Sequence, residues 1–221
     1  MKKKGFTPQF IAVIAMFTAL AYVSVIIAKP IPNVSGFLSY EPKDAIIVIA
    51  GLLISPLASA LISLLVSFIE MITISTTGPY GLIMNVLSTC AFAVPAAWIY
   101  HKNRTKKGAV IGLATGVVCM VICMLLWNYI ITPLYMKVDR SVVAGMMLSV
   151  FLPFNLIKGG INAGITLLIY KPIVKALRSA KLVEASTAEN GKSGFSVGFF
   201  IFSLVVLVTF VLAFLALIGI L

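Results

Sequence analysis

Long apolar runs constrain this chain more than any other feature of its sequence. The run from Phe10 to Ala28 approaches the roughly 20 residues that a helix needs to cross a bilayer, and the final run from Phe195 to Leu221 contains no charged residue. Hydrophobic residues make up 61% of the chain and charged residues 10%, whereas about a quarter of the residues in a soluble domain are charged. We therefore predict an all-α polytopic membrane protein and exclude a soluble catalytic domain.

Turn-forming residues divide the chain into seven apolar segments. Two prolines and a glycine break the chain after Ala28 and leave a loop over residues 29–42. Ser55-Pro56 separates either a short helix from a longer one or the two parts of one kinked helix. The sixth segment is longer than a straight span requires, so we expect a tilt or a kink near Pro153. The predicted segments are residues 8–28, 43–54, 57–75, 80–100, 108–135, 142–174 and 195–221.

A short polar stretch near the C-terminus suggests how the chain is organised. Residues 184–194 are small and polar, as in a linker. We predict a six-helix membrane domain over residues 1–182, a linker over 183–194 and an additional transmembrane helix over 195–221.

The net charge of +11 is better explained by membrane topology than by nucleic-acid binding. The basic residues form short clusters beside apolar runs, as the positive-inside rule requires, rather than one water-exposed face. A cytoplasmic N-terminus places four cations outside, Lys29, Lys43, Lys137 and Arg140, and leaves Lys158 within the membrane. The remaining twelve cations lie on the cytoplasmic side: Lys2, Lys3, Lys4, Lys102, Arg104, Lys106, Lys107, Lys171, Lys175, Arg178, Lys181 and Lys192.

The start of the chain has the charged end of a signal peptide. No convincing cleavage context precedes Lys29-Pro30, so we expect a retained first helix. An even number of spans before the linker keeps the last basic cluster inside, and Leu221 is then expected outside.

Lys158 is the cation that needs a functional explanation. An ammonium deep in a membrane span costs a few kcal/mol unless it faces a partner, a cavity or water. Asn155, Lys158 and Asn162 recur at helical spacing and share one stripe, beside Gly159-Gly160, where a flat ligand or another backbone could approach. Hydrogen bonds to neighbouring helices are the alternative explanation.

Similar polar stripes occur in two other segments. Asn128 lies one turn from Thr132, and Asn85 lies near Gly81 and Thr89. Together with the stripe of the sixth segment, asparagines on three helices could converge on one outward-facing pocket, although each alone is better explained by a helix-packing hydrogen bond.

Glu70 is the acid that lies well inside an apolar run. It either neutralises Lys158 or faces the outer water near Thr76-Thr77.

Catalytic residues are scarce. His101 is the one histidine, so neither a Ser/His/Asp unit nor a histidine metal site can be assembled. Gly191-Lys192-Ser193 lacks the earlier glycine and the strand of a phosphate-binding loop, so any ATP use is expected in partner subunits. We predict no catalytic residues, no metal and no cofactor.

Four motifs together resemble a known family, the substrate-binding (S) components of energy-coupling-factor (ECF) vitamin transporters, and within it the riboflavin-specific members. The resemblance covers residues 6–181. The motifs are Gly36-Phe37-Leu38-Ser39-Tyr40-Glu41-Pro42-Lys43-Asp44, Gly78-Pro79-Tyr80-Gly81 with Asn85, Trp127-Asn128-Tyr129, and Leu152-Pro153-Phe154-Asn155-Leu156-Ile157-Lys158-Gly159-Gly160.

The resemblance implies six helices, a vitamin pocket near the outer surface, a first loop that covers it, and assembly with a transmembrane coupling subunit and two ABC-type ATPase subunits. Ala15 and Ala19 match the small-residue motif that docks the coupling subunit, although they could also pack within the bundle. The segment from Phe195 departs from the six-helix pattern. By this resemblance the substrate-binding positions are Phe37, Leu38, Tyr40, Gly81, Asn85, Asn128, Asn155 and Lys158.

The predicted function is capture of riboflavin outside the cell for ATP-driven uptake, by a subunit of a bacterial-type cell membrane. A flavin has a flat ring and an imide edge, to which asparagine amides can both donate and accept. The sequence leaves open whether flavin mononucleotide is also bound. Two alternatives remain: an S component for another vitamin such as thiamine, and a small membrane enzyme or assembly factor that uses Glu70 and Lys158 as an acid/base pair.

Overall fold

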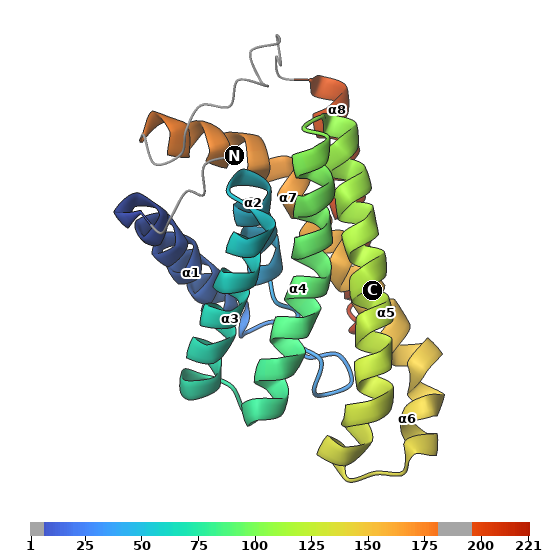
Figure 1. Cartoon of the computed structure of the whole chain (residues 1–221). Coiled ribbons are helices and arrows are strands. Elements are labelled where there is room, and N and C mark those ends of the chain that lie inside the picture. Colours follow the sequence, from blue (N-terminus) through green and yellow to red (C-terminus); the bar gives the residue numbers. More distant parts are fainter. Residues whose placement is uncertain (1–6, 181–195) are drawn as a thin grey trace.

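The protein is a bundle of helices (Figure 1). The computed structural model describes residues 7–180 and 196–221, and one isolated bridge between Val34 and Leu38 is the only extended pairing in those ranges. Lys2, Lys3, Lys4, Lys181, Lys192 and the predicted linker lie outside the described residues. The elements are α1 (Pro8–Ala28), α2 (Lys43–Leu53), α3 (Pro56–Thr73), α4 (Gly78–Lys102), α5 (Lys106–Met136), α6 (Arg140–Met146), the π-helical turn η1 (Met147–Phe151), α7 (Leu152–Ser179) and α8 (Val197–Leu217).

Side-chain caps set several of these helix starts. Ser55 accepts a hydrogen bond from the amide of Ala58, and Pro56 follows it as the first helical residue. A hydroxyl at this position satisfies one of the unpaired amides of the first turn, and proline there loses no helical hydrogen bond. Residues 43–73 are therefore two helices with a tight turn, rather than one kinked helix.

Six helical stretches in the described part of the chain are long and apolar enough to cross a membrane. They include α1, α3, α4, α5, α8 and the continuous stretch from α6 to α7. The chain is a multi-pass membrane protein, as predicted. The exception is α2, because its 11 residues span about 16 Å at 1.5 Å per residue, roughly half of a hydrocarbon core.

The expected irregularity near Pro153 is present as the π-helical turn η1, which ends two residues before it. Proline has no amide hydrogen and its ring crowds the carbonyl four residues earlier, so the regular ladder cannot continue through it. A π turn, with its wider spacing, accommodates such a break. The last part of α7 then lies across one end of the bundle (Figure 1).

The short helix α2 occupies the centre of the bundle. It packs against α1, α3, α4 and α7, and nine of its eleven residues are buried. Around it, α4 and α5 run closely side by side because Gly112 and Gly116 of α5 lie against the backbone of α4, where a larger side chain would collide. The additional helix α8 packs on α7.

Candidate ligand-binding cavity

The loop between α1 and α2 forms a tight turn. Val34 and Leu38 exchange two backbone hydrogen bonds, of 2.9 and 3.0 Å. Between them Ser35 has φ 52° and Gly36 has φ 80°, in the left-handed region that glycine adopts without steric cost. This turn gives the loop a defined shape.

The rest of the loop is attached to the α7 side of the bundle. The ring of Phe37 meets that of Phe151 edge-on, with centroids 6.0 Å apart. The Tyr40 hydroxyl donates to Oδ1 of Asn162 over 3.2 Å. The Asn162 amide in turn donates to the backbone carbonyl of Glu41 over 3.3 Å. Asn162, on the polar stripe predicted for the sixth segment, therefore anchors the loop.

A buried network of five charged side chains begins where the loop meets α2. The Lys43 ammonium lies 2.6 and 2.8 Å from the two carboxylate oxygens of Glu70 and 3.1 Å from Glu41. Lys158 lies 3.4 Å from Glu41 and 3.2 Å from Asp44. Lys43 and Asp44 are fully buried. Such burial is tolerated because every charge has a partner of opposite sign.

Neutral groups complete the network on α4. The Thr89 hydroxyl donates to Oδ1 of Asp44 over 2.6 Å, and the Asn85 amide donates to Glu70 over 3.0 Å. The network joins the loop, α2, α3, α4 and α7.

The network changes the pKa of the Glu41 carboxyl. Burial alone would raise its pKa, but the ammonium groups of Lys43 and Lys158 outweigh burial and hold the pKa well below its usual range. Glu41 therefore stays ionised and bridges the two lysines.

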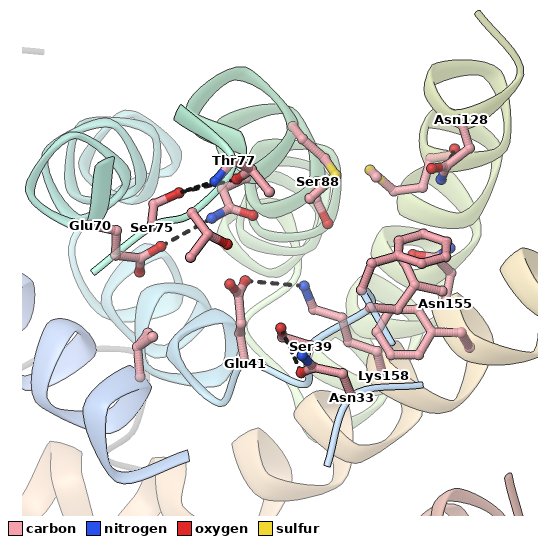
Figure 2. Close-up of a pocket in the computed structure, with 18 of the residues that line it drawn as sticks. Asn33, Ser39, Glu41, Glu70, Ser75, Thr77, Ser88, Asn128, Asn155 and Lys158 are labelled. Carbon is pink, nitrogen blue, oxygen red and sulfur yellow. Dashed lines mark hydrogen bonds and ion pairs between the residues drawn. The ribbon is translucent and has the colours of Figure 1, made fainter. Parts of the chain in front are cut away.

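A cavity of about 370 Å³ opens beside this network, within the size range of small-molecule sites. Figure 2 shows the paired Glu41 and Lys158 at its border, with Glu70 on another side and Asn128 and Asn155 on neighbouring helices. Its walls come from the loop, α1, α3, α4, α5 and α7. Its apolar lining includes Phe37, Leu38, Met84, Met124 and Phe154.

The cavity brings together six of the eight predicted substrate-binding positions. They are Phe37, Leu38, Asn85, Asn128, Asn155 and Lys158. Gly81 lines a smaller adjoining pocket of about 50 Å³, together with Trp127 and Tyr135. Tyr40 lines neither pocket, because its ring points to Asn162 and α8.

Two of the asparagines are oriented by their own helices. The Asn155 amide donates to the carbonyl of Phe151 over 2.8 Å, and the Asn128 amide donates to that of Met124 over 2.7 Å. Thr132 donates to Oδ1 of Asn128 over 2.8 Å. An amide group offers two donors and two acceptor sites, so each side chain is held in place and keeps capacity for a ligand.

Both interpretations of Glu70 are wrong. Its carboxylate pairs with Lys43 rather than Lys158, and it is 3% exposed rather than facing outer water. Lys43, counted among the outer cations, is buried. An acid/base pair of Glu70 with Lys158 is therefore not formed.

Sequence reasoning missed the roles of Glu41, Lys43 and Asp44. A signal was available, because the chain has only six acidic residues and two of them flank Lys43 directly before an apolar helix. Charged residues at the entrance of a buried helix need partners, and Glu70 and Lys158 were the candidates within apolar runs.

The Ala15 and Ala19 side chains are exposed on α1, so they do not pack within this chain's own bundle. In the described part of the chain, histidine, cysteine and acidic residues form no group that could hold a metal ion.

Comparison with known proteins agrees with this arrangement. The family model for the substrate-specific component of ECF transporters matches residues 9–170. A solved structure of the S component of a bacterial ECF transporter superposes with a TM-score of 0.64 at 27% sequence identity, over 76% of this chain and 96% of that one.

Relatives with assigned functions extend the comparison. The riboflavin transporter FmnP of Bacillus subtilis is 28% identical over 189 residues, which are 78% of this chain and 97% of FmnP. The riboflavin transporter RibU of Staphylococcus aureus is 27% identical, over 75% of this chain and 90% of RibU. RibU of Streptococcus thermophilus is also 27% identical, over 76% of this chain and 83% of that protein.

Proposed function

The chain belongs to the family of substrate-specific components of ECF transporters, and we propose that it is a member that binds riboflavin and delivers it for uptake. The family consists of transporter components rather than enzymes. The observation that carries the proposal is the meeting of Asn128, Asn155 and Lys158 at one cavity, in a chain whose relatives are riboflavin transporters.

The chemistry of the cavity suits a flavin. A flavin presents a flat apolar ring system, an edge of imide donors and acceptors, and a hydroxylated tail. The asparagine amides can donate and accept at the imide edge, while Phe154, Met84 and Met124 offer apolar surface to the ring faces. Hydroxyl groups at Ser39, Ser75 and Thr77 can bond the tail.

The balance of charge around the cavity favours an uncharged ligand. Its ionisable lining consists of two lysines, Lys29 and Lys158, and two carboxylates, Glu41 and Glu70. A phosphate would add roughly 1.5 to 2 negative charges near neutral pH and would meet the two carboxylates as well as the lysines. We therefore expect riboflavin to bind more tightly than flavin mononucleotide.

Capture and release require the loop to move. In the closed arrangement Phe37, Leu38, Ser39 and Glu41 all border the cavity. A partner that favours a different loop position would remove these contacts and lower the affinity, because a change of state alters affinity only through contacts that differ between the states.

We extend the proposal to assembly and orientation. The N-terminus lies in the cytoplasm, and residues 1–182, 183–194 and 195–221 form the binding domain, a linker and an additional membrane helix. The exposed Ala15 and Ala19 dock the transmembrane coupling subunit, since small side chains allow helices to approach closely. Two ABC-type ATPase subunits supply the energy.

Direct binding tests the ligand. Protein purified from riboflavin-containing medium should be yellow and release a flavin on denaturation, and ligand-free protein should quench the fluorescence of added riboflavin. A panel with flavin mononucleotide and thiamine compares ligand classes. A colourless preparation that quenches no riboflavin fluorescence would exclude the flavin assignment, and thiamine binding would favour another vitamin.

The variant Asn155→Ala tests the position of the site. Losing one well-placed hydrogen bond of about 1.4 kcal/mol should weaken riboflavin binding about tenfold, with little change in thermal stability. Asn103→Ala is the matched control, because Asn103 is exposed in the turn between α4 and α5. Equal affinities in the two variants would place the ligand elsewhere.

The docking surface has a separate test. Replacing Ala15 and Ala19 by leucine should leave riboflavin affinity unchanged and reduce co-purification with the coupling subunit and uptake into cells. Intact complexes in this variant would rule out α1 as the docking helix.

A further inference from the structure

The helix α8 lies beyond residue 170, where the match to the family model ends. It is nevertheless packed specifically against the rest of the chain. At its start, the ring of Phe199 lies 5.5 Å from the Lys106 ammonium of α5. Helix α8 therefore has a defined partner at this end of the bundle.

The middle of α8 fits against two glycines of α7. A β-carbon at Gly160 would overlap the ring of Phe210, and one at Gly164 would lie 3.0 Å from the Leu207 backbone. Gly160 and Gly164 are one turn apart, so they form a shallow groove on one face of α7. Close approach of this kind is how helices associate in membranes, where apolar burial alone gives little driving force.

The end of α8 reaches the loop that borders the cavity. The ring of Phe214 lies 5.8 Å from that of Tyr40, and Phe214 is only 6% exposed. It shares one apolar cluster with loop residues Val34 and Leu38 and with Phe151 and Phe154. The loop and the end of α8 are thus parts of the same small core.

The position of Tyr40 gives this contact its importance. Leu38, Ser39 and Glu41, on both sides of it in the sequence, line the cavity. The Tyr40 side chain instead points away from the cavity, towards α7 and α8. There its hydroxyl donates a hydrogen bond to Asn162 and its ring contacts Phe214. The loop is therefore held between the cavity on one side and α7 with α8 on the other.

We propose that α8 is a clamp on the binding loop, with Phe214 as the residue that positions Tyr40. Opening the loop must separate the Tyr40 ring from Phe214, so the contact raises the barrier to opening and slows ligand release. This inference rests on the proposed function for its ligand. Phe214 acts through Tyr40 and does not touch the cavity.

The test compares the rate of riboflavin release, measured by the recovery of flavin fluorescence after mixing with a competitor. Phe214→Ala should raise the release rate at least fivefold. Phe214→Tyr, which keeps the ring, should restore slow release. Leu212→Ala is the matched control, because Leu212 is 49% exposed on the same helix, and its release rate should stay within twofold of wild type.

A double-mutant cycle separates the clamp from a general loss of stability. If Phe214 acts through Tyr40, the effects of Phe214→Ala and Tyr40→Leu on release should be less than additive in the double variant. Additive effects, or wild-type release from Phe214→Ala, would overturn the proposal. Phe214→Leu replaces Phe214→Ala if the latter does not yield folded protein.

A second readout does not depend on the ligand. Val34 is 5% exposed and lines neither pocket, so Val34→Cys in a variant lacking Cys90, Cys119 and Cys123 should react with maleimide only when the loop opens. Phe214→Ala should speed this reaction and Leu212→Ala should not. Equal labelling rates would overturn the clamp, whereas faster labelling without any riboflavin binding would retain the clamp and overturn the ligand assignment.

Discussion

Helices α2 and α8 differ from the rest of the bundle in opposite ways. The short α2 begins with Lys43 and Asp44 and is buried along almost its whole length. The 21-residue α8 has no charged residue, is the most apolar of the candidate spans, and buries only Ser203 and Phe214. The more polar helix lies at the centre and the more apolar one at the edge.

The difference follows from the membrane as a solvent. Lipid is as apolar as leucine, so an apolar helix gains little by moving inward. Charged groups gain much, because only the interior offers Lys43 and Asp44 partners of opposite charge away from hydrocarbon. The position of α2 at the centre therefore depends on its ion pairs as well as on its apolar residues, and the network formed by Lys43 and Asp44 adjoins the cavity.

The largest expected effect comes from removing the centre of the network. Lys43→Met leaves Glu70 and Glu41 buried with too few partners, which should cost about 3–5 kcal/mol. The measurement is unfolding in mixed detergent micelles, with Lys107→Met at an exposed lysine as control. The double variant Lys43→Met/Glu70→Gln should recover part of the loss. A single variant as stable as the control would mean that the network does not hold α2 in place.

Acidification should have the next largest effect. Because the folded pKa of Glu41 is depressed, its stabilisation is complete above its unfolded pKa of about 4.3 and is lost as the pH falls towards the folded value. Each lysine keeps one other carboxylate, so the loss is smaller than in Lys43→Met. Thermal melting should be constant from pH 7.5 to 5.5 and fall below about pH 4. Glu41→Gln should reduce that acid sensitivity, and an unchanged profile in this variant would exclude Glu41 as its source.

A single hydroxyl on the network gives a smaller effect. Thr89→Ala removes the donor to Asp44, and a hydrogen bond to a charged group is worth about 1.5–3 kcal/mol. Thr89→Ser keeps the hydroxyl and should retain most of the stability. If alanine and serine melt alike, the bond to Asp44 contributes nothing measurable.

The smallest effect is expected from a buried hydroxyl on α8. Ser203 bonds the carbonyl of Phe199 in its own helix, and such local bonds add little to helix stability. Ser203→Ala should change the unfolding free energy by less than about 0.5 kcal/mol, well below Thr89→Ala. A loss as large as that of Thr89→Ala would remove the contrast between α2 and α8.

Much of the fold could be predicted because it depends on local features. Ser55-Pro56 indicates either a new helix or a kink at that point of the chain, and Pro153 disturbs a helix through its own missing amide hydrogen. The cavity was partly predictable for the same reason, since Asn155 and Lys158 share a helical stripe at fixed spacing. The family resemblance then supplied the loop positions Phe37 and Leu38.

The partners of the charged residues were not predictable in this way. Glu70 and Lys43 are 27 positions apart, and Glu41 and Lys158 are 117 apart. Helical periodicity relates residues within one element and says nothing about which elements meet. For the same reason Tyr40, assigned to the cavity with its loop, belongs to the contact with Asn162 and Phe214.

The sequence by itself determined that the chain spans a membrane in helices, roughly where the apolar segments lie, and that a lysine and several asparagines must be explained. The tertiary structure alone decided which charges pair, that a short helix beginning with Lys43 and Asp44 lies at the centre, and that α8 meets the binding loop. The physical reason is range: hydropathy, caps and proline geometry act within a few residues, whereas ion pairs and helix packing depend on how distant segments are brought together.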